Sequence, residues 1–472
     1  MSVRATRWLK PGLPIVGLGL VSLGLYGWIG LGEGLPGVAA SLGVASPFSA
    51  FVIVSSILFL LYGAAVALLW RMEDTPGLLV LLFCMAVLFR MVLVASPPSL
   101  SSDMYRYIWD GRVQAHGLSP WAHPPGDPAL AELRDKAIYP HINRKGARTI
   151  YPPGAQAGFR LIYKLVGDSV TGTKAMMVMA DLTTIGLLMV LLGQMGVPLH
   201  RVALYAWNPL VIVEVAHSGH LDPLYLPVLV GAFLAHRAGR RSLVGVLVGL
   251  ATLTKLYPAL LVLAFYRRGD RRMPLSWAAV VGLGYLPYIG LGSTVLGFLP
   301  TYLFNQYEEF NQGVRFLARS LSGGGGEQFN LIYLAAASLG LAGLAWLISR
   351  RDDGTVDQAA KRGLLLGGFA LFVVTPALHP WYLLWLLVLG TISPSVTLFA
   401  ASWALTLSYL KYAQRPEVLP MVVRLVEFLP ILALLTWELM RRRSLGRQWD
   451  HSRSALMAPT GFRSPEYRES PS

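Results

Sequence analysis

The stretch SAFVIVSSILFLLYGAAVALLW occupies residues 49–70 and contains no Asp, Glu, Lys or Arg. About 20 consecutive apolar residues are enough for one helix to cross the hydrocarbon core of a bilayer. A second apolar run, PGLLVLLFCMAVLFRMVLVAS, follows at residues 76–96. The two runs predict consecutive transmembrane helices, and they indicate that lipid solvates much of this chain.

The composition of the whole chain supports the same class. Of the 472 residues, 54% are hydrophobic and 14% are charged, and the mean hydropathy is +0.53. A soluble domain has about 25% charged residues, so a soluble enzyme is excluded. The single cysteine, Cys84, lies inside an apolar run, which excludes a disulfide framework. The net charge of +15 comes from short basic clusters between apolar runs, which is typical of membrane topology signals rather than of nucleic-acid binding.

Apolar runs of transmembrane length recur along the chain and predict an all-α polytopic membrane protein of about 12 spans. The first run is too long for a signal-peptide core and lacks a convincing cleavage site, so we expect no cleaved signal. The expected spans are near 11–32, 49–70, 76–96, 174–193, 202–216, 222–236, 274–294, 329–348, 362–376, 380–392, 394–410 and 417–438.

Basic residues fall at alternate turns between these runs, which predicts the orientation of the chain. Short cytoplasmic loops carry an excess of Lys and Arg. We therefore expect both termini and the basic loops to be cytoplasmic in a plasma (inner) membrane. The basic residues are Arg4, Arg7, Lys10, Arg71, Arg237, Arg240, Arg241, Arg267, Arg268, Arg271, Arg272, Arg350, Arg351, Lys361, Arg362, Arg441, Arg442 and Arg443.

The segment 242–265 breaks this alternation, because HRAGRR precedes it and YRRGDRR follows it. Near its middle lies TKLYP, in which Pro258 interrupts a helix and Lys255 places a charge at membrane depth. We expect two half-helices that form a re-entrant pair with Lys255 near the tip. One span kinked at Pro258 is the competing interpretation.

Two hydrophilic loops are expected on the outer face, at 97–173 and 297–328, within one transmembrane domain over 1–445. The second loop could close over a site, because it ends in the flexible run 323–326. Residues 446–472 are polar and predict a disordered cytoplasmic tail. The polar residues of the second loop are Tyr302, Asn305, Gln306, Glu308, Glu309, Asn311, Arg315 and Arg319.

The first outer loop begins with SSDMYRYIWDGRVQAHG at 101–117, which predicts a short interfacial helix capped by serine and stopped by glycine. Asp103 and Asp110 fall on one face of this helix with Arg106 between them. They are candidate functional carboxylates; alternatively, Asp103 complements the helix dipole and Asp110 pairs with a neighbouring arginine. Trp109 suits the headgroup layer.

Three further motifs are expected on the same side of the membrane. The loop motif TIYPPGAQ contains Tyr151, and the motif TPALHPWY contains His379, Trp381 and Tyr382. For these residues, loop architecture and interfacial anchoring are the alternatives to a functional role. Between them, WNPLVIVEVAHSGHLDP brings ionisable residues to a turn between apolar runs, where such groups are usually functional. This turn predicts a substrate-binding patch, with a structural network or a zinc or manganese site as alternatives. Its ionisable residues are Glu214, His217, His220 and Asp222.

The ordered set SDMYRYIWDGRVQAHGLSPW, TIYPPGAQ, WNPLVIVEVAHSGHLD, TKLYP and HPWY resembles the bacterial mannosyltransferase-like members of the GT-C glycosyltransferase superfamily, over about Leu100 to Tyr382. The resemblance implies a GT-C-like helix bundle, a sugar donor on a polyprenyl phosphate and inversion at the anomeric carbon. It also implies that Asp103 is the catalytic base. Better-known members have an Asp-X-Asp pair, whereas here Met104 and Tyr105 follow Asp103, so no definite cofactor is implied and a divalent cation stays open.

Physical reasoning leads independently to a lipid-linked donor. Nucleotide sugars made in the cytoplasm are not available to a site on the outer face. Transfer then needs a carboxylate for the acceptor proton and cations for the departing phosphate. Asp103 fits the first role, and Lys255, Arg106 and Arg315 fit the second. Glu214, His220 and Asp222 are candidates for hydrogen bonds to sugar or acceptor, and the rings expected to stack on a sugar or line a prenyl groove are Trp109, Trp121, Trp381 and Tyr382.

The expected reaction is therefore transfer of a hexose, with mannose favoured, to a lipid or glycan acceptor. Two alternatives remain at this point. A transporter or flippase for a polyprenyl-linked sugar would also have broken helices and an intramembrane lysine. An outer-face glycan ligase would share the topology and differ in the size of its acceptor.

Overall fold

A computed structural model describes residues 3–304, 310–324, 326–350 and 354–456, and side chains within 12–441 of these ranges. Helices are the only regular elements in the described residues, so the predicted all-α class is confirmed. Asn305, Gln306, Glu308 and Glu309 of the expected second outer loop lie outside the described residues.

The first half of the bundle surrounds the outer-loop helices. Its main helices are α1 (Val3–Gly30), α2 (Gly34–Leu42), α3 (Pro47–Leu69), α4 (Pro76–Val94), α5 (Asp103–Ala115), α6 (Pro153–Val166), α7 (Val170–Met195), α8 (Ala203–Ala206), α9 (Pro209–Ile212) and α10 (Leu226–Arg237). A π-helical turn, η4 (Val213–His217), follows α9, and 3-10 turns η1 (Pro128–Leu133), η2 (Tyr139–His141), η3 (Leu199–Val202) and η5 (Asp222–Leu224) complete this half.

The second half continues with shorter helices around one long apolar helix. Its helices are α11 (Arg241–Thr254), α12 (Leu260–Phe265), α13 (Arg272–Tyr285), α14 (Leu299–Phe304), α15 (Val314–Leu321), α16 (Glu327–Ser349), α17 (Val356–Phe369), α18 (Leu384–Ile392), α19 (Val396–Ala404) and α20 (Met421–Leu456). Between them lie η6 (Tyr257–Ala259), η7 (Leu286–Leu296), the π-helical turn η8 (Ala370–Val374), η9 (Pro380–Leu383) and η10 (Leu405–Ala413).

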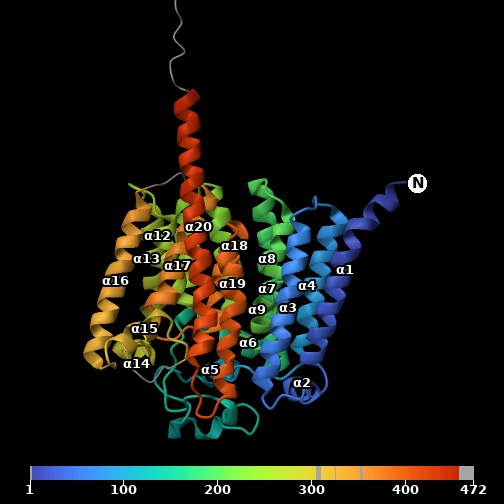
Figure 1. Cartoon of the computed structure of the whole chain (residues 1–472). Helices are drawn as coiled ribbons and strands as arrows, with labels where there is room; N and C mark the ends of the chain where they lie inside the picture. Colours follow the sequence, from blue (N-terminus) through green and yellow to red (C-terminus); the bar gives the residue numbers. More distant parts are fainter. Residues whose placement is uncertain (1–2, 305–309, 325, 351–353, 457–472) are drawn as a thin grey trace, which may run out of the picture.

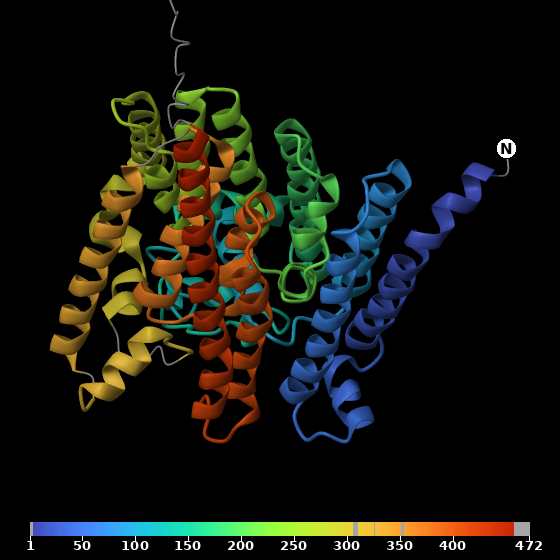
Figure 2. The same ribbon diagram turned by 45° about the horizontal axis from the view of Figure 1, so that its top comes forward.

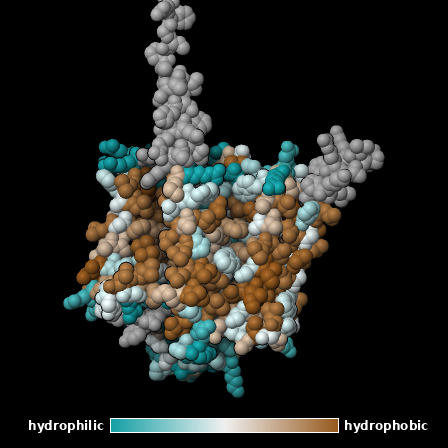
Figure 3. Space-filling model, viewed as in Figure 1, coloured by the Kyte–Doolittle hydropathy of each residue, from teal (hydrophilic) through white to brown (hydrophobic). Residues whose placement is uncertain are grey.

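The long helices lie side by side, and a belt of hydrophobic residues surrounds their middle on the face seen in Figure 3, with hydrophilic residues at both ends. By length and composition, six helical segments of the described chain could cross a membrane. The predicted count of about 12 spans is not confirmed, because several expected spans are short or broken helices, such as α8 and α9. The six segments are Gly12–Gly30, Pro47–Leu69, Pro76–Val94, Val170–Met195, Arg272–Phe304 and Glu327–Ser349.

The loops between α4 and α6 lie at one end of the bundle, and the start of α1 and the far end of α20 lie at the other (Figures 1 and 2). This arrangement agrees with the predicted placement of the termini opposite residues 97–173. Helix α20 continues to Leu456, so the first part of the expected tail at 446–472 is helical, and residues 457–472 lie outside the described residues.

A buried polar network explains why the apolar run 76–96 tolerates an arginine. The Arg90 Nε lies 2.5 Å from Asp181 Oδ2, and Tyr205 donates its hydroxyl to the other oxygen of the same carboxylate at 2.5 Å. Arg90 also donates to the Ala206 carbonyl at 2.9 Å. An unpaired charge inside a membrane protein is costly, so this network fixes α4, α7 and α8 against one another.

The segment 242–265 forms a helical hairpin whose two ends meet. Arg241, at the start of α11, donates to the Phe265 carbonyl at 2.5 Å and to Asp270 Oδ2 at 2.6 Å. The helix stops at Thr254, because Lys255 is extended and Pro258 has no amide hydrogen to donate. The hairpin geometry is compatible with the predicted re-entrant pair; its depth in a bilayer stays a prediction.

Candidate active site

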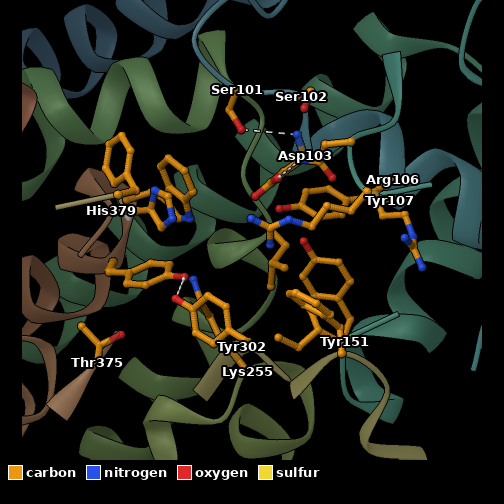
Figure 4. Close-up of a pocket in the computed structure, with 18 of the residues that line it drawn as sticks. Ser101, Ser102, Asp103, Arg106, Tyr107, Tyr151, Lys255, Tyr302, Thr375 and His379 are labelled. Atoms are coloured by element: carbon orange, nitrogen blue, oxygen red, sulfur yellow. Dashed lines mark hydrogen bonds between the residues drawn. The ribbon is translucent and has the colours of Figure 1, made fainter. Parts of the chain in front are cut away.

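A cavity of about 1100 Å³ lies at the loop end of the bundle (Figure 4). The start of α5, the turn between α11 and α12, helix α14, and turns η9 and η10 contribute to its wall. On α16 the cavity contacts Leu341, which is 14 residues (341 − 327) from the loop end of that helix at Glu327. At about 1.5 Å per residue, the cavity wall therefore includes a point roughly 20 Å along α16 from the start of that helix.

Asp103 is the first residue of α5 and faces this cavity (Figure 4). Its backbone N–H donates to Ser101 Oγ at 3.3 Å, so a serine satisfies one of the free donors at the helix start. The carboxylate accepts a hydrogen bond from Asn143 Nδ2 at 3.2 Å, and its side chain is 26% exposed. Asp103 is thus an accessible carboxylate held at a fixed place on the cavity wall.

Two buried residues, Glu214 and His220, lie close to Asp103. His220 Nδ1 is 4.0 Å from Asp103 Oδ2, and His220 Nε2 is 3.3 Å from Glu214 Oε2. Glu214 also accepts the Tyr409 hydroxyl at 2.8 Å. Glu214 belongs to the π-helical turn η4, and π turns are frequent at functional sites. Neither Glu214 nor His220 lines the cavity, so they support the site rather than contact a ligand in it.

Lys255 lines the cavity and also forms an ion pair with Asp222. Its Nζ lies 2.7 Å and 2.8 Å from the two carboxylate oxygens, and Tyr225 donates to the same carboxylate at 2.7 Å. Asp222 is fully buried, whereas the Lys255 side chain is 15% exposed. Lys255 therefore forms an internal salt bridge and also lines the cavity, and its role in binding the donor stays a prediction.

Basic side chains outnumber acidic ones on the cavity wall. The described lining residues include five Lys or Arg and two acids, Asp103 and Glu417. Arg106 is oriented by Asp110, which accepts its Nε–H at 2.8 Å. This excess of positive charge suits an anionic ligand. The basic lining residues are Arg106, Arg144, Arg148, Lys255 and Lys411.

Stacked rings form one side of the site. His220 stacks on Trp381 with ring centroids 3.9 Å apart, Trp381 on His379 at 4.3 Å, and His379 on Phe310 at 4.3 Å. Tyr382 hydrogen-bonds Tyr302 at 3.0 Å at the base of the cavity. Tyr151 also lines the cavity, packed edge-on against Tyr107. The HPWY and TIYPP motifs are therefore brought together with Asp103, as expected.

Seven of the residues proposed from the sequence do not line the cavity: Glu214, His220, Asp222 and the four described next. Asp110 is buried and accepts hydrogen bonds from Arg106, Thr149 and Gln156, so it organises the loop instead. Trp109 is buried against Tyr139.

Arg315, on α15, is another of them. It donates to Asn330 Oδ1 at 2.7 Å and does not line the cavity. Trp121, expected to stack on a sugar, is buried beside Tyr288 instead.

The interfacial position predicted for α5 is not confirmed. The helix starts and stops where expected, and Gly117 has φ +77°. Its aromatic residues, however, are covered by protein: Tyr107 and Trp109 are 3% and 1% exposed. An aromatic helix pattern fits a headgroup layer and a loop-covered surface equally well, so the sequence could not distinguish them.

Sequence reasoning missed Arg144, Arg148 and Lys411, because they lie outside any motif. The one available signal was the basic run NRKGAR at 143–148, in a loop expected to be outside, where positive charge is unusual. Arg144 has φ +49°, and its guanidinium lies 5.1 Å from the Phe298 ring centroid.

The site does not offer a metal ion a suitable set of ligands. In the part of the chain that the structure describes, no three His, Cys, Asp or Glu side chains are grouped to hold a cation. Asp103 is a single carboxylate with an amide neighbour, and Asp222 is occupied by Lys255. The divalent cation left open by the sequence therefore has no fitting site among these residues.

Residues 150–376 match the model of glycosyltransferase family 87. The matched stretch includes Tyr151, Glu214, His220 and Lys255, and it begins after Asp103. No curated protein matches the chain significantly. The match is to a membrane glycosyltransferase family of the GT-C-like kind, and it confirms the superfamily resemblance.

Proposed function

From the premise that this membrane protein is a glycosyltransferase, we propose that it transfers a hexose from a polyprenyl-phosphate donor to a lipid or glycan acceptor on the outer face of the membrane. Mannose is the hexose we favour, because the sequence motifs resemble mannosyltransferases. The reaction inverts the anomeric carbon.

The observation that carries this proposal is the combination of groups in one cavity. An accessible carboxylate, Asp103, and several cations lie at the outer-loop end. From there the cavity continues past apolar side chains to Leu341, roughly 20 Å along α16. A ligand with a charged head and a long hydrocarbon tail fits this distribution, and a polyprenyl-phosphate sugar has both.

Asp103 is proposed as the base. The acceptor hydroxyl oxygen attacks the anomeric carbon, its proton passes to Asp103, and the bond between that carbon and the phosphate oxygen breaks. The electron pair of the broken bond leaves with the phosphate. Phosphate is a good leaving group, so no general acid is needed.

Lys255 and Arg106 are proposed to stabilise the departing phosphate. Both line the cavity with Asp103 and are held by buried carboxylates, Asp222 and Asp110. Cations that are already oriented stabilise developing negative charge without reorganisation. Arg144 and Lys411 extend the positive wall and are further candidates for the phosphate contact.

The rings of His379, Trp381 and Tyr382 are proposed to bind the sugar. Aromatic faces and a cationic neighbour occur together here, because Lys255 Nζ lies 5.0 Å from the Tyr382 ring centroid. The hairpin of α11 and α12 is proposed to enter the bilayer from the cytoplasmic side as a re-entrant pair, in a bundle of about 12 crossings.

The test uses purified protein in proteoliposomes with a radiolabelled polyprenyl-phosphate mannose donor and membrane lipid as acceptor. We expect label in a new glycolipid, in amounts that depend on Asp103. Label that crosses the bilayer while still on polyprenyl phosphate would instead indicate a transporter. Transfer of a whole preassembled glycan, with none of a single hexose, would indicate a ligase. Parallel glucosyl and galactosyl donors test the choice of mannose.

A further inference from the structure

His220 is placed between two carboxylates, and nothing in the proposed chemistry above uses it. Resting on the proposed function, we infer that His220 is a positioning residue: as an imidazolium held by Glu214, it faces Asp103 and keeps that carboxylate ionised and aimed at the cavity. The line of groups runs from Tyr409 through Glu214 and His220 to Asp103.

The distances define this line. Tyr409 donates to Glu214 Oε1 at 2.8 Å, and the other oxygen, Oε2, lies 3.3 Å from His220 Nε2. His220 Nδ1 lies 4.0 Å from Asp103 Oδ2. Among the described residues, neither ring nitrogen of His220 has a hydrogen-bond partner, and neither has Glu214 Oε2. The ring nitrogens of a buried histidine are normally bonded, so their orientation toward two carboxylates calls for an explanation.

Burial makes the charges interact strongly. His220 and Glu214 are 1% and 0% exposed. A buried carboxylate is costly unless a cation compensates it, and His220 is the basic group that the structure places beside Glu214. An imidazolium between Glu214 and Asp103 compensates both carboxylates at once.

Packing fixes the ring in this place. One face of His220 stacks on Trp381 at 3.9 Å, with 16° between the planes. The preceding Gly219 has φ +71°, a conformation that favours glycine, and a Cβ there would collide with Met104 of α5. The chain therefore brings His220 close against α5, which begins with Asp103.

Other charged or titratable groups surround His220, and they bear on its pH dependence. The groups that face this region are Asp103 from α5, Lys174 from α7, Glu214 from η4, Asp222 from η5, Lys255 from the turn after α11, His379 before η9 and Tyr409 from η10.

The test measures kcat and donor KM for mannosyl transfer against pH in wild type, His220→Gln and Glu214→Gln. Glutamine keeps hydrogen-bonding capacity and removes the charge. Because each substitution removes a charged or ionisable group from the line that ends at Asp103, we expect kcat to fall more at low pH than at neutral pH, so that the acidic limb of kcat moves upward in pH. Donor KM should stay within about twofold, a difference of about 0.4 kcal/mol.

His200→Gln is the matched control. His200 is also buried and pairs with a carboxylate, Asp74, at 2.8 Å, but at the opposite end of the bundle. Its pH profile should match that of wild type. Thermal unfolding of each variant separates a loss of folding from a loss of positioning, and Glu214→Gln preserves the test if His220→Gln does not fold.

Folded variants with an unshifted acidic limb would overturn the inference, as would a loss of kcat that is equal at every pH. Either result would leave the proposed function standing, because wild type would still transfer mannose and Asp103→Asn would still be inactive. Absence of transfer by wild type from every polyprenyl-phosphate hexose would overturn the proposed function and this role together.

Discussion

Lys255 shows how a proposed site residue can also have a structural partner that the sequence does not reveal. Its position at membrane depth predicted a functional cation, and the structure adds a buried partner, Asp222, 33 residues earlier in the chain. Local spacing cannot reveal such a pairing, because tertiary packing creates it. The same holds for His220 and Trp381, which stack although 161 residues separate them (381 − 220).

The ion pair changes what replacement of Lys255 should do. Lys255→Met leaves Asp222 buried without its cation, which typically costs about 3–5 kcal/mol of stability. The double variant Lys255→Met/Asp222→Asn should recover most of that stability, yet still have a raised KM for the donor phosphate. Thermal unfolding in detergent and transfer kinetics measure the two effects. Normal donor KM in the double variant would restrict Lys255 to its structural role.

Asp135, in the loop between α5 and α6, allows a second test with a single residue. Burial opposes its ionisation, but the Ile138 N–H and the Arg112 guanidinium outweigh that effect and hold the pKa of Asp135 below its ordinary value. Because the pKa of Asp135 is lower in the folded loop than in the unfolded chain, its ionisation stabilises the folded loop at pH values above the unfolded pKa of about 3.9. This stabilisation is lost as the pH falls through the pKa of the folded loop.

We therefore expect hydrogen-exchange protection of residues 133–139 to be constant from about pH 7 to pH 5 and to fall below about pH 4. Asp135→Asn should have low protection throughout and little pH dependence. Protection in this variant equal to that of wild type at pH 7 would contradict the assigned contacts.

At the scale of elements, helix existence could be predicted from apolar runs and capping residues, and helix breaks could not. Pro47 and Pro76 follow the N-cap residues Ser46 and Thr75, so the starts of α3 and α4 are legible in the sequence. The π-helical turn at Val213–His217 has no such signature. This turn depends on tertiary contacts of its polar side chains. The segment 202–216, expected to be one span, is therefore divided into α8, α9 and the start of the turn.

The loop after the hairpin of α11 and α12 allows a test of the predicted membrane topology. In a Cys84→Ala background, cysteine at Ala129 should react with an impermeant thiol reagent in intact cells, and cysteine at Arg268 should react only after permeabilisation. Both positions are exposed in loops. Arg268 is preferred over its neighbour Gly269, whose φ of +82° disfavours a side chain. Labelling of Arg268→Cys in intact cells would reverse the orientation and remove the re-entrant assignment.

At the scale of the whole molecule, the cavity joins charged residues at the loop end of the bundle to an apolar residue on α16, Leu341. Helix α16 and the segment Arg272–Phe304 are scarcely buried, so lipid can reach the apolar part of the cavity beside them. Composition predicted a membrane protein, but the shared cavity arises from how separate helices pack. The sequence therefore predicted the class and placed Asp103 among the candidate site residues, whose role stays a prediction, and it missed Arg144, Arg148 and Lys411.

A bulky residue in the apolar part of the cavity should interfere with the donor tail. Leu341 lines that part, and a tryptophan in its place would overlap the space proposed for the prenyl tail. Overpacking typically costs about 1–3 kcal/mol, so we expect Leu341→Trp to raise KM for a long-chain donor. A donor with a short prenyl chain should be affected much less. Leu339→Trp is the control, since Leu339 is 74% exposed on the same helix. Equal effects on both donors would place the tail elsewhere.

Asp103 is proposed as the base of the transfer reaction, and kcat of the variant Asp103→Asn tests this role. Asparagine keeps the size of the side chain and can accept from Asn143, so expression and thermal stability should match wild type. Glu417→Gln is the comparison, because Glu417 is the other described acid on the cavity wall and pairs with Arg415. Loss of a general base typically costs about 10²- to 10⁴-fold in rate. We expect kcat to fall by this factor in Asp103→Asn and to change little in Glu417→Gln. A folded Asp103→Asn that transfers mannose at the wild-type rate would show that Asp103 is not the base.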